Sequence, residues 1–442
     1  MANETKLKDS SVLKLILTMS LPMILVMLVN VLYNMADVFF MGRTGDTMAV
    51  AGVSLASPVF SAISAFNTLI GFGGCTAVSI ALGRSEHKLV KKYTAFVLYF
   101  ALFLGLLLIP LILVFLNGLL KLLGTDQETL PHAKAYLGIL AFGTPFMLTA
   151  GALGNTLRAD GDSKNPVIIA LISNVVNIVL DALLILVFHL GAAGAAAATV
   201  ASNILCCILT LIAAVKKELF SLSIRDFSLK PEISLHILGL GLPMAAGTLL
   251  MSIAHVFSNR LMVGYGNLAV AARSAAGKIS MLIPMIIMGV CMGIQPAMSY
   301  AYGRNDKKRL GEITLKTGLF ALVLGCLMAA AALIFRGALV TAFLPDPKVL
   351  ELGKLMMIGS VATVPVYAVY QLCSSYLQAV GKVSHATFTS LLRQGIVYIP
   401  VLYAMNALFQ LNGMIFSTMV SDIISTAIAV VLSLKFHRNF KP

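Results

Sequence analysis

The sequence has 442 residues, of which 59% are hydrophobic and only 11% are charged. A soluble domain carries about a quarter charged residues, so a water-soluble enzyme or binding module is excluded. The net charge of +14 would suit a nucleic-acid-binding protein, but the basic residues lie mostly in short segments between apolar runs. The composition therefore predicts an integral membrane protein without a nucleic-acid partner.

Apolar runs of about 20 residues or more recur along the whole chain, and each is long enough to cross ~30 Å of hydrocarbon as a helix. A membrane barrel would instead need alternating segments of about ten residues. The sequence therefore predicts an all-α integral membrane fold with twelve transmembrane helices. In chain order they are expected near 13–42, 47–83, 93–118, 132–158, 164–189, 191–215, 235–264, 268–303, 314–343, 352–380, 386–410 and 413–436.

The second half of the sequence repeats the first, as where Leu21-Pro22-Met23 returns as Leu242-Pro243-Met244. We expect an N-lobe over 1–220 with helices 1–6 and a C-lobe over 221–442 with helices 7–12, joined by a polar linker at about 216–234. Because six helices return the chain to the same side, the two six-helix bundles should be related by a pseudo-two-fold axis along the membrane normal.

Lysine and arginine are distributed unevenly between alternate connections. If the N-terminus is cytoplasmic, 23 of them fall on the cytoplasmic side and 6 on the other side. This count assigns Arg393, with Lys382, to the cytoplasmic side. The positive-inside rule then predicts that both termini are cytoplasmic.

Three acidic residues cannot be placed in loops, tails or helix ends: Asp37, Asp181 and Asp422. A carboxylate in hydrocarbon is costly and marks a candidate functional site. With a rise of about 1.5 Å per residue, Asp37 and Asp181 lie roughly 8–12 Å below the outer boundary of their helices. Since they share a depth and a lobe, we expect them to share a cavity.

Other polar side chains of the N-lobe have a similar depth or share a helical face with these acids: Tyr33, Asn174, Asn177 and Thr199. Two carboxylates in a partly dry pocket repel each other, and a bound proton or hard cation relieves the repulsion. The pattern predicts a cation-coupling site, with Asp37, Asp181 and Asn177 as possible sodium ligands. A structural hydrogen-bond network is the alternative.

The C-terminal copy lacks this acidic pair, because Ser258 stands at the position of Asp37 and Val401 at that of Asp181. Its embedded charges are mostly cationic: Arg260, Arg273 and Lys278. Coupling is therefore expected in the N-lobe alone. A Lys278–Asp422 ion pair is one arrangement for the remaining charges, and a structural or water-lined contact is the other.

A substrate cavity could be lined by Asn34, by its counterpart His255, and by a stripe of methionines at helical spacing, Met281, Met285, Met288 and Met292. Methionine is flexible and polarizable, which suits a promiscuous pocket, although helix packing explains such a stripe equally well. Pro22 bends helix 1 and is a candidate conformational residue, with a static kink as the alternative.

No phosphate-binding loop, zinc motif or nucleophile elbow is present, so neither an enzyme nor a cofactor is expected. The only enzyme candidate is the pair Asp160 and Asp162, which is better explained as a loop turn. Two repeated bundles around a central site favour a transporter.

These features resemble the multidrug and toxic compound extrusion (MATE) family, in its DinF-like bacterial branch beside the MepA-like pumps. The resemblance covers essentially the whole chain. It rests on Ser20-Leu21-Pro22, on Tyr33 to Asp37, on Leu157 to Asp162, on Asn177 to Asp181 and, more weakly, on Asn406 to Phe409.

The resemblance implies a V-shaped pair of six-helix lobes that exports drugs against proton or sodium entry. It assigns cation coupling to Tyr33, Asp37, Asn177, Asp181 and Thr199, and helix bending to Pro22. A related branch also uses acids in helices 7 and 10, which this chain lacks, and this argues against a C-lobe cation site.

We therefore expect a multi-pass antiporter of a bacterial plasma (inner) membrane that exports amphipathic or cationic compounds and contacts membrane lipids as a monomer. A lipid-linked precursor flippase of related fold is the alternative, with Arg260, Arg273 and Lys278 as hints of a pyrophosphate groove.

Overall fold

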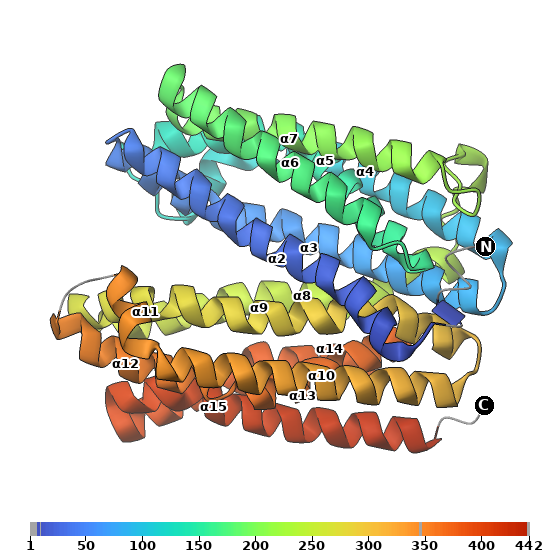
Figure 1. Cartoon of the computed structure of the whole chain (residues 1–442). Helices are drawn as coiled ribbons and strands as arrows, with labels where there is room; N and C mark the ends of the chain where they lie inside the picture. Colours follow the sequence, from blue (N-terminus) through green and yellow to red (C-terminus); the bar gives the residue numbers. More distant parts are fainter. Residues whose placement is uncertain (1–6, 9, 344–346, 440–442) are drawn as a thin grey trace. The chain divides into compact units, whose positions relative to one another are not determined.

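The computed structural model describes residues 7–8, 10–343 and 347–439. Across these ranges the chain is helical and contains no strand (Figure 1). Eleven helical segments in the described part are long and apolar enough to cross a membrane. The last of them, Val383–Arg438, is 56 residues long and holds two of the twelve expected spans. The all-α membrane fold predicted from the sequence is confirmed.

The first half of the chain forms six long helices whose bounds follow the expected spans closely. They are α2 (Val12–Arg43), α3 (Thr47–Gly83), α4 (His87–Leu122), α5 (Leu130–Thr156), α6 (Lys164–Asp181) and α7 (Gly191–Val215). Short irregular helices follow three of them: η1 (Leu157–Asp160), η2 (Ala182–Val187) and η3 (Ile224–Asp226).

The second half is more interrupted, because several expected spans are divided between two helices. Its elements are α8 (Pro231–Val263), α9 (Asn267–Gly303), α10 (Lys307–Ile334), α11 (Arg336–Phe343), α12 (Pro347–Val361), α13 (Val364–Ala379), α14 (Val383–Leu391), η4 (Leu392–Ile396) and α15 (Tyr398–Asn439). Within α15, Gln410 has φ 52° and ψ −133°, which ends one helix and starts the next.

The chain packs as two compact units, which we describe separately. Over the described residues, unit 1 holds 25–245, and unit 2 holds the chain up to residue 24 and from residue 246 onward. Both divisions fall inside a helix, shortly after Pro22 in α2 and shortly after Pro243 in α8. These two units are defined by which residues pack together. The boundary between 1–220 and 221–442 is defined by the sequence repeat and stays a prediction.

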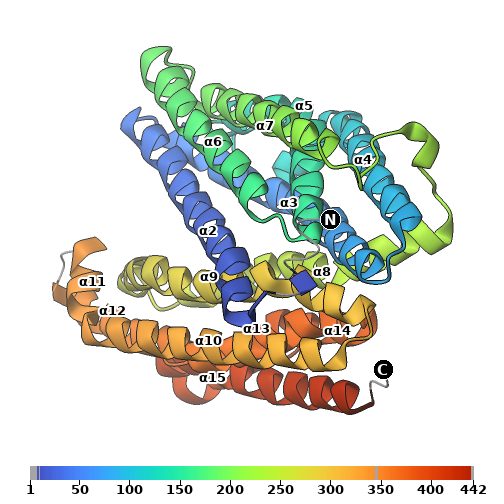
Figure 2. The ribbon, with the colours of Figure 1, turned by 45° about the vertical axis from the view of Figure 1, so that its right-hand side comes forward.

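Unit 1 is built around α5, whose apolar window is two-thirds buried. Close approach of α4 and α5 depends on Gly105, because a Cβ there would lie 2.4 Å from the Cα of Pro145. The hydroxyl of Thr144 also donates to the carbonyl of Gly105 at 2.8 Å. The small residues of α7 pack against neighbouring helices as expected for an alanine-rich stretch, and α6 runs beside α7 in both views of the molecule (Figures 1 and 2).

Unit 2 has α9 at its centre, since residues Ser280–Gly303 form its most buried window. The first part of α2 packs on this helix at Gly293, where a Cβ would lie 2.6 Å from the Cα of Ser20. The hydroxyl of Ser20 donates to the carbonyl of Val290 at 2.9 Å. Backbone contact of this kind fixes the register between the two helices.

Candidate functional site

Asp37 on α2 and Asp181 at the end of α6 come together in unit 1. Their carboxyl groups lie within hydrogen-bonding reach of each other. Asp181 is fully buried and Asp37 is partly buried. The π-helix η2 begins directly after Asp181, and such widened turns are frequent at functional sites. The proximity expected from their equal depth is therefore present, and the shared cavity and its role in cation coupling stay predictions.

Asn177 connects Asp181 to α7. In the orientation that satisfies both neighbours, its side-chain nitrogen donates to Asp181 Oδ2 at 3.0 Å, and its oxygen accepts the backbone N–H of Thr199 at 3.2 Å. Asn177 lies one helical turn before Asp181, which is why its amide reaches the carboxylate. Three of the six residues expected at the site, Asp181, Asn177 and Thr199, are therefore linked by hydrogen bonds.

The pocket contains buried oxygen atoms that lack donors. Within the described ranges, no hydroxyl, amide or charged group donates to Asp37 Oδ1 or Asp181 Oδ1. A buried acceptor without a donor costs about 1–3 kcal/mol, and more when it is charged. A proton shared by the two acids, or a hard cation between the oxygens, would satisfy these atoms.

Two tyrosines border the acids. Tyr33, one turn before Asp37 on α2, lies near Thr199. Tyr136 on α5 is buried and lies near both acids, and the sequence reasoning missed it. Its position about 9 Å into α5, the same depth as the acids, was the signal that could have found it.

Asn174 is the member of the expected set that lies outside the acidic contact. Its amide donates to the side-chain oxygen of Asn30 at 3.1 Å, which joins α6 to α2 one turn away from Asn177. This bond holds together the two helices that carry the acids. Pro22 lies inside α2, which continues through it from Val12 to Arg43.

The residues expected to line a substrate cavity are distributed along their helices. The methionine stripe on α9 runs from Met281, which is exposed, through half-buried Met285 and Met288 to buried Met292. His255 on α8 is exposed. The side chain of Asn34 lies outside the described part of the structure.

Asp422 pairs with Arg393, which corrects one expectation. Arg393 Nε donates to Asp422 Oδ1 at 2.7 Å, and its Nη2 to Oδ2 at 3.5 Å. The guanidinium also stacks on Tyr367 and Tyr370, with ring centroids at 4.4 and 5.2 Å. Arg393 was wrongly counted among cytoplasmic loop residues, because it lies in η4 and is largely buried. Among the described residues the partner of Asp422 is Arg393. The expected Lys278–Asp422 pair involves a side chain that lies outside the described residues and stays a prediction.

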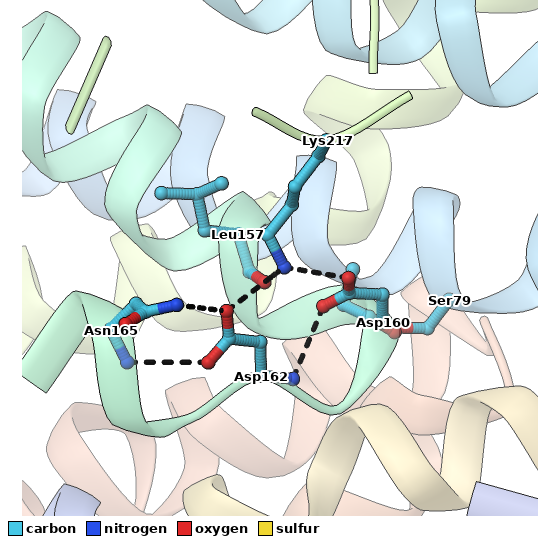
Figure 3. A network of polar contacts seen from close by, with 7 residues as sticks. Ser79, Leu157, Asp160, Asp162, Asn165 and Lys217 are labelled. Atoms are coloured by element: carbon cyan, nitrogen blue, oxygen red, sulfur yellow. Dashed lines mark hydrogen bonds and ion pairs between the residues drawn. The ribbon is translucent and has the colours of Figure 1, made fainter. Parts of the chain in front are cut away.

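The turn after α5 is tied to the end of α7 by an ion-pair cluster (Figure 3). Lys217 Nζ contacts Asp160 Oδ2 at 2.6 Å, Asp162 Oδ2 at 3.1 Å and the carbonyl of Leu157 at 3.4 Å. Asn165 donates to Asp162 from its backbone and its side chain. Burial raises the pKa of Asp162, but Lys217 and these hydrogen bonds outweigh it and hold that pKa below its usual range.

Comparison with known proteins gives the family. The MatE family model matches residues 22–183 and again 243–404. The chain belongs to the MatE family. The two matches begin at Pro22 and Pro243, the prolines that the internal repeat of the sequence also brings into correspondence.

Curated relatives and solved structures agree with this membership. The chain is 29% identical to "Multidrug export protein MepA" of Staphylococcus saprophyticus over 96% of its own length and 94% of that protein, and 29% identical to the MepA of Staphylococcus aureus strain NCTC 8325 with the same shares. A structure described as MATE in the bent conformation superposes with a TM-score of 0.93 at 22% identity, covering 100% of this chain and 98% of that one.

A second structure has the same fold. An outward-facing multidrug resistance MATE family transporter of the MOP superfamily superposes with a TM-score of 0.92 at 23% identity, covering 99% of this chain and 98% of that one. The protein therefore has the fold of a MATE-family membrane transporter, as the sequence resemblance predicted.

Proposed function

We propose that the protein is an antiporter that exports amphipathic, often cationic, compounds in exchange for a proton or a sodium ion bound between Asp37 and Asp181. Membership of the MatE family and similarity to multidrug export proteins support the export activity. The acidic pocket of unit 1 supports the choice of the coupling site.

The observation that carries the coupling proposal is the contact between two carboxyl groups, each of which has a buried Oδ1 that lacks a donor among the described residues. Two negative charges in one buried pocket repel each other, and desolvation adds to the cost. Entry of one cation removes both penalties. The pocket is therefore most stable when it is loaded, and unloading it requires a compensating gain elsewhere.

That gain is the binding of the exported compound. A ligand shifts a conformational equilibrium only by its different affinities for the two states. We infer that the compound binds better to the state in which Asp37 and Asp181 are empty, and the cation to the other state. By linkage, each then weakens the binding of the other, which is the condition for exchange.

The two coupling ions make different demands on this pocket. A proton needs only the two carboxyl groups, whereas sodium needs several oxygen ligands, which the side chain of Asn177 and the hydroxyl of Thr199 could add to the carboxylates. We propose a bacterial plasma membrane location with both termini cytoplasmic, and function as a monomer without a further cofactor.

Dye efflux from proteoliposomes tests the proposal. The wild type and Asp37→Asn are reconstituted, and a proton gradient and a sodium gradient are imposed separately. We expect one gradient to drive dye movement through the wild type and at least a tenfold lower rate through Asp37→Asn, because the amide cannot carry the exchanged charge. Asp46→Asn is the matched control, since it makes the same substitution at an exposed acid that caps α3, where an asparagine still caps the helix.

Two outcomes would contradict the proposal. If Asp37→Asn moved dye at the wild-type rate, the coupling site would lie elsewhere. If neither gradient drove dye while the protein translocated a fluorescent lipid, the flippase alternative would replace drug export.

A further inference from the structure

The C-terminal copy of the repeat carries a positive charge where the N-terminal copy carries its acids. When Leu21 is aligned with Leu242, Ser258 stands at the position of Asp37. Arg273 Nη1 donates to the hydroxyl of Ser258 at 2.6 Å and approaches its carbonyl at 3.4 Å. In the same alignment the counterpart of Arg273 is Gly52, where a Cβ would lie 2.9 Å from the carbonyl oxygen of Thr129. The two copies therefore differ in chemistry at one place in the fold.

Arg273 is held by groups from three helices of unit 2. It lies about 9 Å from the start of α9, Ser258 is on α8, and Tyr398 opens α15. The hydroxyl of Tyr398 donates to the hydroxyl of Ser258 at 3.3 Å and also contacts Arg273. Because groups from three helices hold it in place, the half-buried guanidinium of Arg273 is a preorganised hydrogen-bond donor.

The partners of this guanidinium within unit 2 are neutral. The four acids of unit 2 in the described ranges are all engaged elsewhere: Asp306 caps α10, Glu312 pairs with Lys316, Glu351 with Lys354, and Asp422 with Arg393. The nearby charged or titratable side chain is His255, which adds no negative charge. Hydroxyls and a carbonyl accept hydrogen bonds from Arg273 but leave its charge without a counter-ion.

A guanidinium inside a membrane protein is costly without a counter-ion, and its planar fork matches a carboxylate through two parallel hydrogen bonds. The three helices that hold Arg273 also carry aromatic and apolar side chains, with Phe257 of α8 and Tyr403 of α15 in edge-to-face contact at 6.3 Å and Met281 exposed on α9. A ligand suited to these groups has an aromatic or apolar body and one carboxylate.

We propose that Arg273, positioned by Ser258 and Tyr398, is a subsite that binds the carboxylate of zwitterionic amphipathic compounds. The inference rests on the export activity proposed above and names the residues that would hold the carboxylate when an exported compound carries one. Lipid phosphate is the other oxyanion that could meet Arg273, and the test separates the two.

The test uses two dyes that differ in one group. Rhodamine B has a free carboxylate, and its ethyl ester has the same ring system and positive charge without it. Their binding to the full-length protein in a phosphate-free detergent is measured by fluorescence polarisation for the wild type, Arg273→Gln, Arg273→Lys and Arg260→Gln. Arg260 is the matched control, because it is an exposed arginine on α8 and its loss removes the same charge.

We expect Arg273→Gln to weaken the binding of rhodamine B about tenfold or more, while the ester changes less than twofold. Arg273→Lys should retain part of the preference, because it keeps the charge but not the fork. Arg260→Gln should leave both dyes unchanged.

Four results would overturn the inference. Equal loss of both dyes in Arg273→Gln would show a structural clamp, and no loss of either would show that the subsite is unused; in both cases wild-type binding of the ester would leave the export proposal standing. Loss of the rhodamine B preference when phosphatidylglycerol is added to the wild type would assign Arg273 to lipid phosphate. If the wild type bound neither dye, the export proposal itself would fail together with the subsite.

Discussion

Asp422 and Arg393 show how a charge is kept inside the hydrocarbon region of this protein. The carboxylate is 2% exposed and the guanidinium 17% exposed, and they contact each other through two nitrogens. Asp37 and Asp181 have no such cationic partner in the described part of unit 1. A carboxylate that is permanently paired cannot exchange a cation, whereas the unpaired acids can, so the two lobes differ in what they can bind.

We predict that Arg393→Met destabilises the protein by about 3–5 kcal/mol, because it leaves the carboxylate of Asp422 buried and unpaired. The double variant Arg393→Met with Asp422→Leu should recover most of this loss. The measurement is the apparent midpoint of thermal unfolding in detergent at one scan rate. Arg336→Met is the control, since Arg336 is exposed and contacts only the carbonyl of Leu333 among described residues. A double variant no more stable than the single one would contradict the pairing.

The sequence indicated how deep in the membrane a charged residue lies, but not which side of its helix the residue is on. Depth follows from counting residues at about 1.5 Å each, and it brought Asp37 and Asp181 together correctly. Arg393 was misplaced because its partner, Asp422, is 29 residues away across a reversal of the chain. Tyr136 was missed because a neutral side chain does not carry the energetic cost of burial that makes a charged residue stand out in a membrane segment.

At the scale of elements, the cluster of Lys217, Asp160 and Asp162 ties the turn after α5 to the end of α7 (Figure 3). Gly161 in this turn has φ 88°, a left-handed conformation that glycine adopts without strain. The sequence identified the turn, and the structure adds the lysine that crosses to it from 57 residues away. Such a tie holds the ends of these two helices together.

We predict that this cluster makes stability depend on pH. The pKa of Asp162 is lowered in the folded state, so its contribution is complete above the unfolded value of about 4 and is lost as the pH falls through the lower folded value. Between pH 5 and pH 3 the wild type should lose more thermal stability than Lys217→Met, which has already lost the pairing.

Lys216→Met is the control for this prediction, because Lys216 is exposed next to Lys217. It should follow the wild type across the pH range. Identical acid dependence in Lys217→Met and the wild type would show that the cluster does not carry the effect.

Helix bounds were predicted best where apolar runs end at polar turns. Those of α3 and α7 agree with the sequence prediction, since glycine and charged residues follow them. The later spans divide at positions that hydropathy cannot show. α12 and α13 are separate helices because Pro365, in the first turn of α13, has no backbone N–H to donate to the preceding helix. At Gln410 the chain reverses between two helices without a polar loop.

At the scale of the whole molecule, two copies of one six-helix pattern have come to carry different chemistry. The MatE model matches both copies, at residues 22–183 and 243–404. The first copy gathers two acids, and the second holds Arg273 and the Arg393–Asp422 pair. The repeat was visible in the sequence because proline and glycine positions mark it.

The orientation predicted from the uneven distribution of basic residues is tested by reporter fusions. Moving Arg393 from the loops to the membrane interior still leaves 22 basic residues on one side and 6 on the other. We predict that green fluorescent protein fused after Pro442 fluoresces in cells and that alkaline phosphatase fused there is inactive. The reverse pattern would contradict cytoplasmic termini.

The measurement that tests the central claim most directly is the release of the coupling cation when an exported dye binds. Purified protein in weakly buffered detergent, without and then with sodium, is mixed with saturating rhodamine ester, and released protons or sodium ions are recorded. We predict release from the wild type and none from Asp37→Asn, with polarisation confirming that both bind the dye. Equal release from the two proteins, or dye binding without release from either, would contradict exchange at Asp37 and Asp181.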